Sequence, residues 1–220
     1  MFHRLFIALI LCCVACASDA AEPEDKKSSR PKAEEKLDQT ETPLPDGVPE
    51  KQDNIVNRGR AGVIETVVDA QSEEEWRKLD LDTGEQSDDE KKWDLSFSRS
   101  RILINGGLSG PGSVSVATLR QAFDKVNDVP ADDEFHGEEP DSTGEKGDAD
   151  TLPDNPFYSS GDDWFVYNVM THELTPREVT FVVKSTEDRN YKLRFLGYYD
   201  SDNGTPGVVS FRWIELNSGE

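Results

Sequence analysis

Residues 93–112 read WDLSFSRSRILINGGLSGPG, and this stretch decides the fold class. Trp93, Leu95 and Phe97 alternate with polar residues, which is the period of a β-strand with one buried face and one solvent face. The apolar pattern continues to Ile104, so we expect one core strand that runs on to the glycines. The glycine-rich end predicts two close turns, because glycine adopts backbone angles that other residues avoid.

Alternating patterns predict strands in the rest of the chain as well. These expected strands are residues 62–68, 76–81, 164–170, 178–184, 191–199 and 208–215, and the last three form a meander. Leu119, Phe123 and Val126 have helical spacing instead, which predicts a short helix or turn within residues 116–126. The sequence therefore predicts a single antiparallel all-β domain. Its inward-facing side chains are expected to include Trp93, Leu95, Phe97, Phe181, Val183, Leu193 and Phe195.

The first 15 residues are typical of an export signal. A short basic start precedes an apolar run that is far below the roughly 20 residues of a membrane-spanning helix. All three cysteines lie within residues 12–16, so no disulfide is expected in the exported domain. A small Ala15 precedes Cys16, and we expect lipidation at Cys16. The alternative is an ordinary secretory signal cut near Ala17 or Ala20.

Two polar segments flank or interrupt the expected domain. Residues 16–55 have few large apolar side chains and no aromatic ones, so we expect a disordered acidic and proline-containing tether. The β-domain then spans residues 56–220. Within it, residues 128–154 contain eleven acidic side chains and one lysine, which predicts a long irregular insertion.

Composition excludes several classes of function. The chain has 24 basic and 45 acidic residues, a formal net charge of −21, so nucleic acid is not an expected partner. No nucleophile elbow, zinc-protease motif or phosphate-binding loop occurs, and we expect no enzyme. The loop that begins at Asp200 is similar to a calcium loop, but Phe211 stands where a bidentate glutamate is needed. An acidic hairpin turn is the better interpretation.

Two blocks of sequence resemble the HmuY-type haem-binding lipoproteins. The first is the WD-hydrophobe-F-x-R strand at residues 93–99 followed by the N-G-G-x-S-G turn at 105–110. The second runs from Trp164 and Tyr167 through the HELTP segment at 172–176 to the final strands. The resemblance covers roughly residues 64–216 and implies an HmuY-like β-domain that holds haem through paired histidine or methionine side chains.

The expected haem ligands are the histidines and the methionine that follow the signal. They are His136, Met170 and His172, and both residue types serve as axial ligands of haem iron. Met170 and His172 are two residues apart, so on a continuing strand they would point to the same side. We expect His172 to bind haem iron with His136 or Met170 opposite. The aromatic residues expected to line the haem slot are Phe135, Trp164 and Tyr167.

Two functions follow from the sequence. The first, implied by the resemblance, is a lipid-anchored haem-binding protein of the outer membrane or cell surface that passes haem to a TonB-dependent receptor. The second is a non-enzymatic module of the cell envelope that binds a protein, a glycan or calcium without haem. A secreted or periplasmic location remains the alternative to a lipid anchor.

Overall fold

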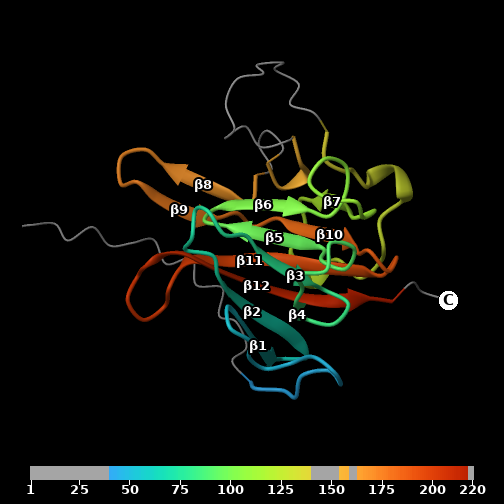
Figure 1. Ribbon diagram of the computed structural model, residues 1–220, viewed down its shortest axis with the longest axis horizontal. Coiled ribbons are helices and arrows are strands. Elements are labelled where there is room, and N and C mark those ends of the chain that lie inside the picture. Colours follow the sequence, from blue (N-terminus) through green and yellow to red (C-terminus); the bar gives the residue numbers. More distant parts are fainter. Residues whose placement is uncertain (1–39, 140–153, 159–162, 218–220) are drawn as a thin grey trace, which may run out of the picture. The chain divides into compact units, whose positions relative to one another are not determined.

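Two antiparallel sheets and a separate hairpin make up the part of the chain that the computed structural model describes, residues 40–139, 154–158 and 163–217 (Figure 1). The larger sheet contains, in spatial order, β1 (Ile55–Arg60), β2 (Val63–Asp69), β12 (Pro206–Leu216), β11 (Asn190–Tyr199), β10 (Thr180–Lys184) and β7 (Ser115–Leu119). The smaller sheet contains β4 (Glu85–Gln86), β3 (Arg77–Asp80), β5 (Leu95–Ser98) and β6 (Arg101–Ile104). The hairpin pairs β8 (Phe165–Asn168) with β9 (Glu173–Pro176). Helical structure in the described residues is limited to three single turns, η1 (Phe123–Lys125), η2 (Asp132–Glu134) and η3 (Pro156–Tyr158).

The core lies between the two sheets. The ring of Phe97 on β5 stacks on the ring of Phe211 on β12, with centroids 5.7 Å apart and planes at 18°. Side chains from both sheets form one contiguous buried cluster. All seven side chains that were expected to face inward are buried, and the predicted meander β10–β11–β12 is present. The prediction of an all-β antiparallel domain is therefore confirmed, and no helix in the described residues has the length and apolar character to span a membrane.

The expected continuous strand from Trp93 to Ile104 is wrong in one respect, because it is two strands. The chain reverses at Arg99 and Ser100, so that Ser98 pairs with Arg101 and Phe97 with Ile102. Arg99 has a φ of 56°, a left-handed conformation that favours glycine or asparagine. β5 and β6 therefore form a tight hairpin, and its turn contains neither glycine nor asparagine.

The glycine-rich turn after β6 is built around the Asn105 side chain. Its carbonyl oxygen accepts the Gly112 backbone N–H at 2.9 Å, and its amide donates to the Glu90 carbonyl at 3.0 Å. Gly107 has a φ of 64°, and a Cβ there would lie 2.4 Å from the backbone oxygen of Glu138. The turn therefore requires glycine both for its backbone angle and for the close approach of the following insertion.

Residues 116–126 contain most of the strand β7 and the single 3-10 turn η1, so of the predicted short helix or turn only the turn is present. Residues 115–119 pair with β10 along the whole length of β7, and only η1 is helical. Ala117 and Val126 lie in a second small core with Val182 and Leu216. The spacing of Leu119 and Val126 thus reflects one residue at the end of the strand and one just after the turn, which contribute separately to this core.

Part of the expected tether belongs to the domain. The Thr42 backbone N–H donates to the Gly59 carbonyl at 3.0 Å, and the Asn57 side chain donates to the Pro49 carbonyl at 2.8 Å. Leu44 and Val48 are partly buried against the main core. The described part of the domain therefore includes residues 40–55, and the boundary expected at residue 55 is too late.

Removing residues 38–54 should destabilise the domain. A chain that starts at residue 55 is expected to lose about 2 kcal/mol or more of unfolding free energy relative to one that starts at residue 38, because Leu44 and Val48 lose their packing. Urea denaturation of the two shortened chains measures this difference. Equal midpoints and slopes would mean that the segment contributes nothing to stability.

Candidate functional site

The hairpin β8–β9 presents a histidine, a methionine and a tyrosine at its exposed tip. The Asn168 side-chain oxygen accepts the Met170 backbone N–H at 2.9 Å, and the His172 backbone N–H donates to the Asn168 carbonyl at 2.8 Å. His172 itself has a φ of 57°. The chain therefore turns between Asn168 and Glu173, and the expectation that Met170 and His172 share one side of a continuing strand is wrong.

The His172 ring is oriented by Tyr167. The Tyr167 hydroxyl lies 2.7 Å from His172 Nδ1. When Nδ1 carries the proton, it donates to the hydroxyl and leaves the lone pair of Nε2 free on an exposed ring. Metal-bound histidines commonly use their other nitrogen for such an orienting contact. The structure thus brings together three of the expected residues, His172, Met170 and Tyr167, in one hairpin.

Exposed apolar side chains are concentrated on the same hairpin. Among the described residues, the exposed large hydrophobic side chains are Leu108, Val166, Tyr167, Val169 and Met170, of which Met170 is 85% exposed. Four of these five belong to residues 166–170. Such an apolar surface is unusual on a highly charged domain and is typical of a contact site. Val166 and Val169 were missed as site candidates, although both fall within the predicted strand 164–170.

His136 lies elsewhere, at the edge of the larger sheet. Its backbone exchanges two hydrogen bonds with Val116, at 2.9 and 3.0 Å. His136 lines an open hollow of about 780 Å³ together with four acidic residues, Asp133, Glu134, Glu139 and Asp154. In Figure 1 the tip of hairpin β8–β9 lies at the left, and the yellow chain around η2 lies at the right. The structure does not bring His136 and His172 together.

Two of the aromatic residues that were expected to line the haem slot, Trp164 and Phe135, pack in or against the hydrophobic cores. Trp164 is 0% exposed, its ring packs on Phe195 with centroids 4.8 Å apart, and its Nε1–H donates to the Ser100 carbonyl at 3.1 Å. Phe135 packs on the second small core. Trp164 therefore belongs to the main core and does not line an open slot, and Tyr167 is the expected aromatic that lies beside a candidate ligand.

A hollow with two arginines lies at the base of the hairpin. It has a volume of about 460 Å³ and is lined by Glu73, Arg99, Ser100, Arg101 and Tyr198. The Ser100 carbonyl that accepts from Trp164 connects this hollow to the start of β8. The nearest Arg99–Glu73 approach is 4.0 Å, and the Arg101 guanidinium donates to the Glu73 carbonyl at 2.8 Å. The hollow is thus lined by two arginines and one glutamate, and this excess of positive charge can attract an anionic group.

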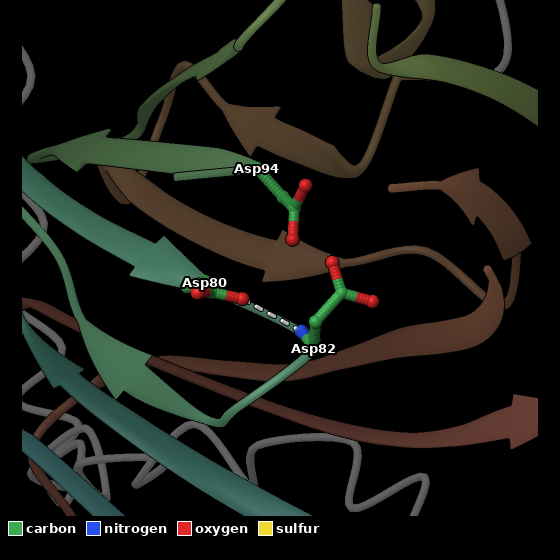
Figure 2. Close-up of side chains that lie close together, drawn as sticks. All are labelled: Asp80, Asp82 and Asp94. Atoms are coloured by element: carbon green, nitrogen blue, oxygen red, sulfur yellow. Dashed lines mark hydrogen bonds between the residues drawn. The ribbon is translucent and has the colours of Figure 1, made fainter. Parts of the chain in front are cut away.

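A buried group of three carboxylates lies at the other end of the smaller sheet. Asp80 ends β3, Asp82 follows it in the turn, and Asp94 precedes β5. One carboxylate oxygen from each lies within 4.8 Å of the other two (Figure 2). Burial raises the pKa of Asp94 to about 7, and burial also raises the pKa of Asp80. We refer to these three residues as the carboxylate cluster, and it was not predicted from the sequence.

Several solved structures have a fold similar to that of this domain. Its fold is shared by an apo HmuY analogue from Tannerella forsythia, with a TM-score of 0.53, 18% identity, and coverage of 76% of this chain and 98% of that one. A protein of Bacteroides fragilis, provisionally described as a lipoprotein, has a TM-score of 0.53 and 18% identity over 71% of this chain and 92% of its own. A Bacteroides vulgatus protein, provisionally described as HmuY-like and haem-binding, has a TM-score of 0.52 and 15% identity over 71% and 93%.

These similarities define the class, a β-domain with the HmuY architecture. The HmuY protein family matches residues 72–213, which is well over half of the chain. The chain therefore belongs to the HmuY family, as the two blocks of sequence indicated. Curated protein sequences include no match to it.

Proposed function

We propose that this protein binds haem at the tip of hairpin β8–β9 and has no catalytic role. The observation that carries the proposal is the placement of an exposed histidine, methionine and tyrosine among exposed apolar side chains. Histidine and methionine are axial ligands of haem iron, and apolar and aromatic surface contacts the macrocycle. Membership of the HmuY family and the description of the Bacteroides vulgatus relative support the same ligand.

His172 is the proposed axial ligand from the hairpin. Its contact with Tyr167 fixes the ring and leaves Nε2 available in one tautomer. Met170 or His136 supplies the second ligand, as expected from the sequence. Met170 belongs to the same turn, whereas His136 requires the acidic insertion, of which residues 140–153 lie outside the described part, to approach the hairpin.

The carboxylates of haem have candidate partners near the base of the hairpin. Arg99 and Arg101 line the hollow that adjoins the start of β8, and guanidinium groups pair well with carboxylates. The hollow around His136 is lined by four acidic residues and none of its described lining residues is a lysine or an arginine, so it would repel the same anionic groups. This difference in charge favours the hairpin over the His136 hollow as the place where haem first binds.

Spectra of the haem-loaded protein test which ligands are used. Ferric haem with two imidazoles differs from haem with one imidazole and one thioether in its near-infrared charge-transfer bands and in its electron paramagnetic resonance g values. We expect Met170→Ala to change these features if Met170 is the second ligand, and His136→Ala to change them if His136 is. If neither variant alters the spectrum of the loaded protein, both ligand pairs are excluded.

We further propose that the protein is exported and anchored through lipid on Cys16, and that it passes haem to an outer-membrane receptor of the TonB-dependent class. Cys16 and the segment up to residue 39 lie outside the described residues. The description of the Bacteroides fragilis relative as a lipoprotein supports the anchor. The proposed location is the outer membrane or cell surface.

Replacement of Cys16 tests the anchor directly. In cells that express the full chain, Cys16→Ala is expected to move most of the protein out of the membrane fraction, because no acyl chains are attached to the variant. Globomycin, which blocks the lipoprotein signal peptidase, should cause unprocessed wild-type protein to accumulate. Unchanged membrane partitioning of the variant would refute lipidation at Cys16.

A further inference from the structure

The carboxylate cluster combines close approach with deep burial. Asp94 is 0% exposed, Asp80 is buried, and the side chain of Asp82 is 2% exposed. Figure 2 shows carboxylate oxygens of Asp82 and Asp94 directed toward each other, with Asp80 beside them. Three carboxylates in so small a buried volume repel one another strongly when they are charged.

Most oxygens of the cluster already have hydrogen-bond donors. Asp94 accepts the backbone N–H groups of Leu81 and Thr186, each at 2.7 Å. Asp82 Oδ1 accepts the hydroxyl groups of Ser185 and Tyr191, each at 2.9 Å. The cluster thereby ties the β3–β4 turn and the start of β5 to the loop between β10 and β11.

One oxygen of the cluster is an exception. Among the described residues, no hydrogen-bond donor reaches Asp82 Oδ2, although this atom is buried. A buried carboxylate oxygen without a partner costs free energy and requires a compensating group. This observation is separate from the proximity of the three carboxylates, and it leaves Asp82 Oδ2 open to a ligand that no described protein group supplies.

The neighbouring arginine does not balance the charge. Arg189 lies 3.6 Å from Asp82 Oδ1, but the same guanidinium also pairs with Glu215 through two of its nitrogens. One cation therefore faces two anionic partners before Asp80 and Asp94 are considered.

We propose that Asp80, Asp82 and Asp94 bind one divalent cation of the calcium type. The donors are carboxylate oxygens without nitrogen or sulfur, which suits a hard cation. Calcium binds oxygens at about 2.3–2.6 Å, so two ligands on opposite sides of the ion are separated by about 4.6–5.2 Å. One carboxylate oxygen from each aspartate lies within 4.8 Å of the other two, so all three can bind one such ion.

A cation here would strengthen the structure that carries the hairpin without taking part in haem binding. It would join β3, β5 and the β10–β11 loop, and β11 also contacts β9. A cavity of about 180 Å³, lined in part by Asp82 and Tyr191, adjoins the cluster on the side of Asp82. The site differs from the calcium-like loop at Asp200, where Asp200 Oδ1 accepts the backbone N–H groups of Asp202 and Asn203.

Terbium luminescence and thermal unfolding of the purified protein test the proposal. Trp93 adjoins Asp94 in sequence and the Tyr191 hydroxyl binds Asp82, so both can sensitise terbium bound in the cluster. We expect saturable luminescence that calcium displaces. We also expect chelator-treated protein to gain about 5–10 °C in Tm at a calcium concentration about 100 times Kd.

Asp82→Asn should abolish both effects, and Asp200→Asn is the matched control that should retain them. Retention of both effects in Asp82→Asn would overturn the proposal, whether or not Asp200→Asn retains them. An absence of any calcium-dependent shift in wild-type Tm would overturn it as well, and this measurement stands even if Asp82→Asn fails to fold. If the Tm of the wild type does not respond to calcium, a proton rather than a metal ion neutralises the carboxylate cluster.

Discussion

Replacing Trp164 with alanine is expected to lower the free energy of unfolding by about 3–5 kcal/mol. The indole is fully buried, and its ring packs on Phe195 and on Phe165 with centroids 4.8 and 4.9 Å away. The substitution leaves a large cavity and removes the hydrogen bond to the Ser100 carbonyl. Urea denaturation of the wild type and the variant measures the loss.

Trp164→Phe separates packing from hydrogen bonding. It keeps much of the ring and removes the Nε1–H donor, and we expect a smaller loss of about 1–2 kcal/mol. Tyr167→Ala is the surface control, because Tyr167 is exposed on the same hairpin, and its stability should stay within about 1 kcal/mol of the wild type. A loss for Trp164→Ala that is no larger than that for Tyr167→Ala would contradict the placement of Trp164 in the core.

Replacing His172 with asparagine should weaken haemin binding by about tenfold or more, since a factor of ten requires only about 1.4 kcal/mol of lost binding free energy. Asparagine tolerates the left-handed backbone of this position better than alanine does, so the turn is preserved while the imidazole is removed. The remaining complex should change from a six-coordinate low-spin to a high-spin spectrum. Absorption titration and electron paramagnetic resonance measure the affinity and the spin state.

Glu173→Gln is the matched control for His172→Asn. It alters the adjoining exposed residue, the first of β9, and removes no proposed haem ligand. Its affinity for haemin should remain within about threefold of the wild type, a difference of less than 1 kcal/mol. Equal affinities of His172→Asn and the wild type would exclude His172 as a ligand.

The strands of the core could be predicted because burial imposes a strict alternation on them. Trp93, Leu95 and Phe97 belong to such a pattern, and all three are buried as expected. The β5–β6 turn was not predicted, since neither Arg99 nor Ser100 is one of the glycine or asparagine residues that mark a tight hairpin turn most strongly. Pairing of Ser98 with Arg101 between two apolar strands imposes the left-handed conformation on Arg99.

The start of the domain could not be predicted from the sequence either. Residues 40–54 have the composition of a linker, and their attachment depends on backbone hydrogen bonds such as Thr42 to Gly59. Only Leu44 and Val48 contribute apolar surface there. Composition indicates how much surface a segment can bury, but it does not indicate which backbone groups find partners.

The candidate site was predicted in part. The sequence indicated His172, Met170 and Tyr167, but it could not show that a turn fixed by Asn168 separates the strand from His172. Trp164 was assigned to a haem slot because aromatic residues serve in cores and in ligand sites alike. The carboxylate cluster was missed because Asp94 is distant in sequence from Asp80 and Asp82, and only the pairing of β3 with β5 brings them together.

Titration of the purified wild-type protein with haemin, followed by absorption in the Soret region, tests the central claim most directly. Haem binding at hairpin β8–β9 predicts a shifted, saturable Soret band at one haem per chain and at micromolar haemin, with the spectrum of low-spin iron. A linear increase without saturation, identical to that of haemin in buffer, would contradict haem binding. The domain would then be better explained as a cell-envelope module that binds another partner through its exposed hairpin.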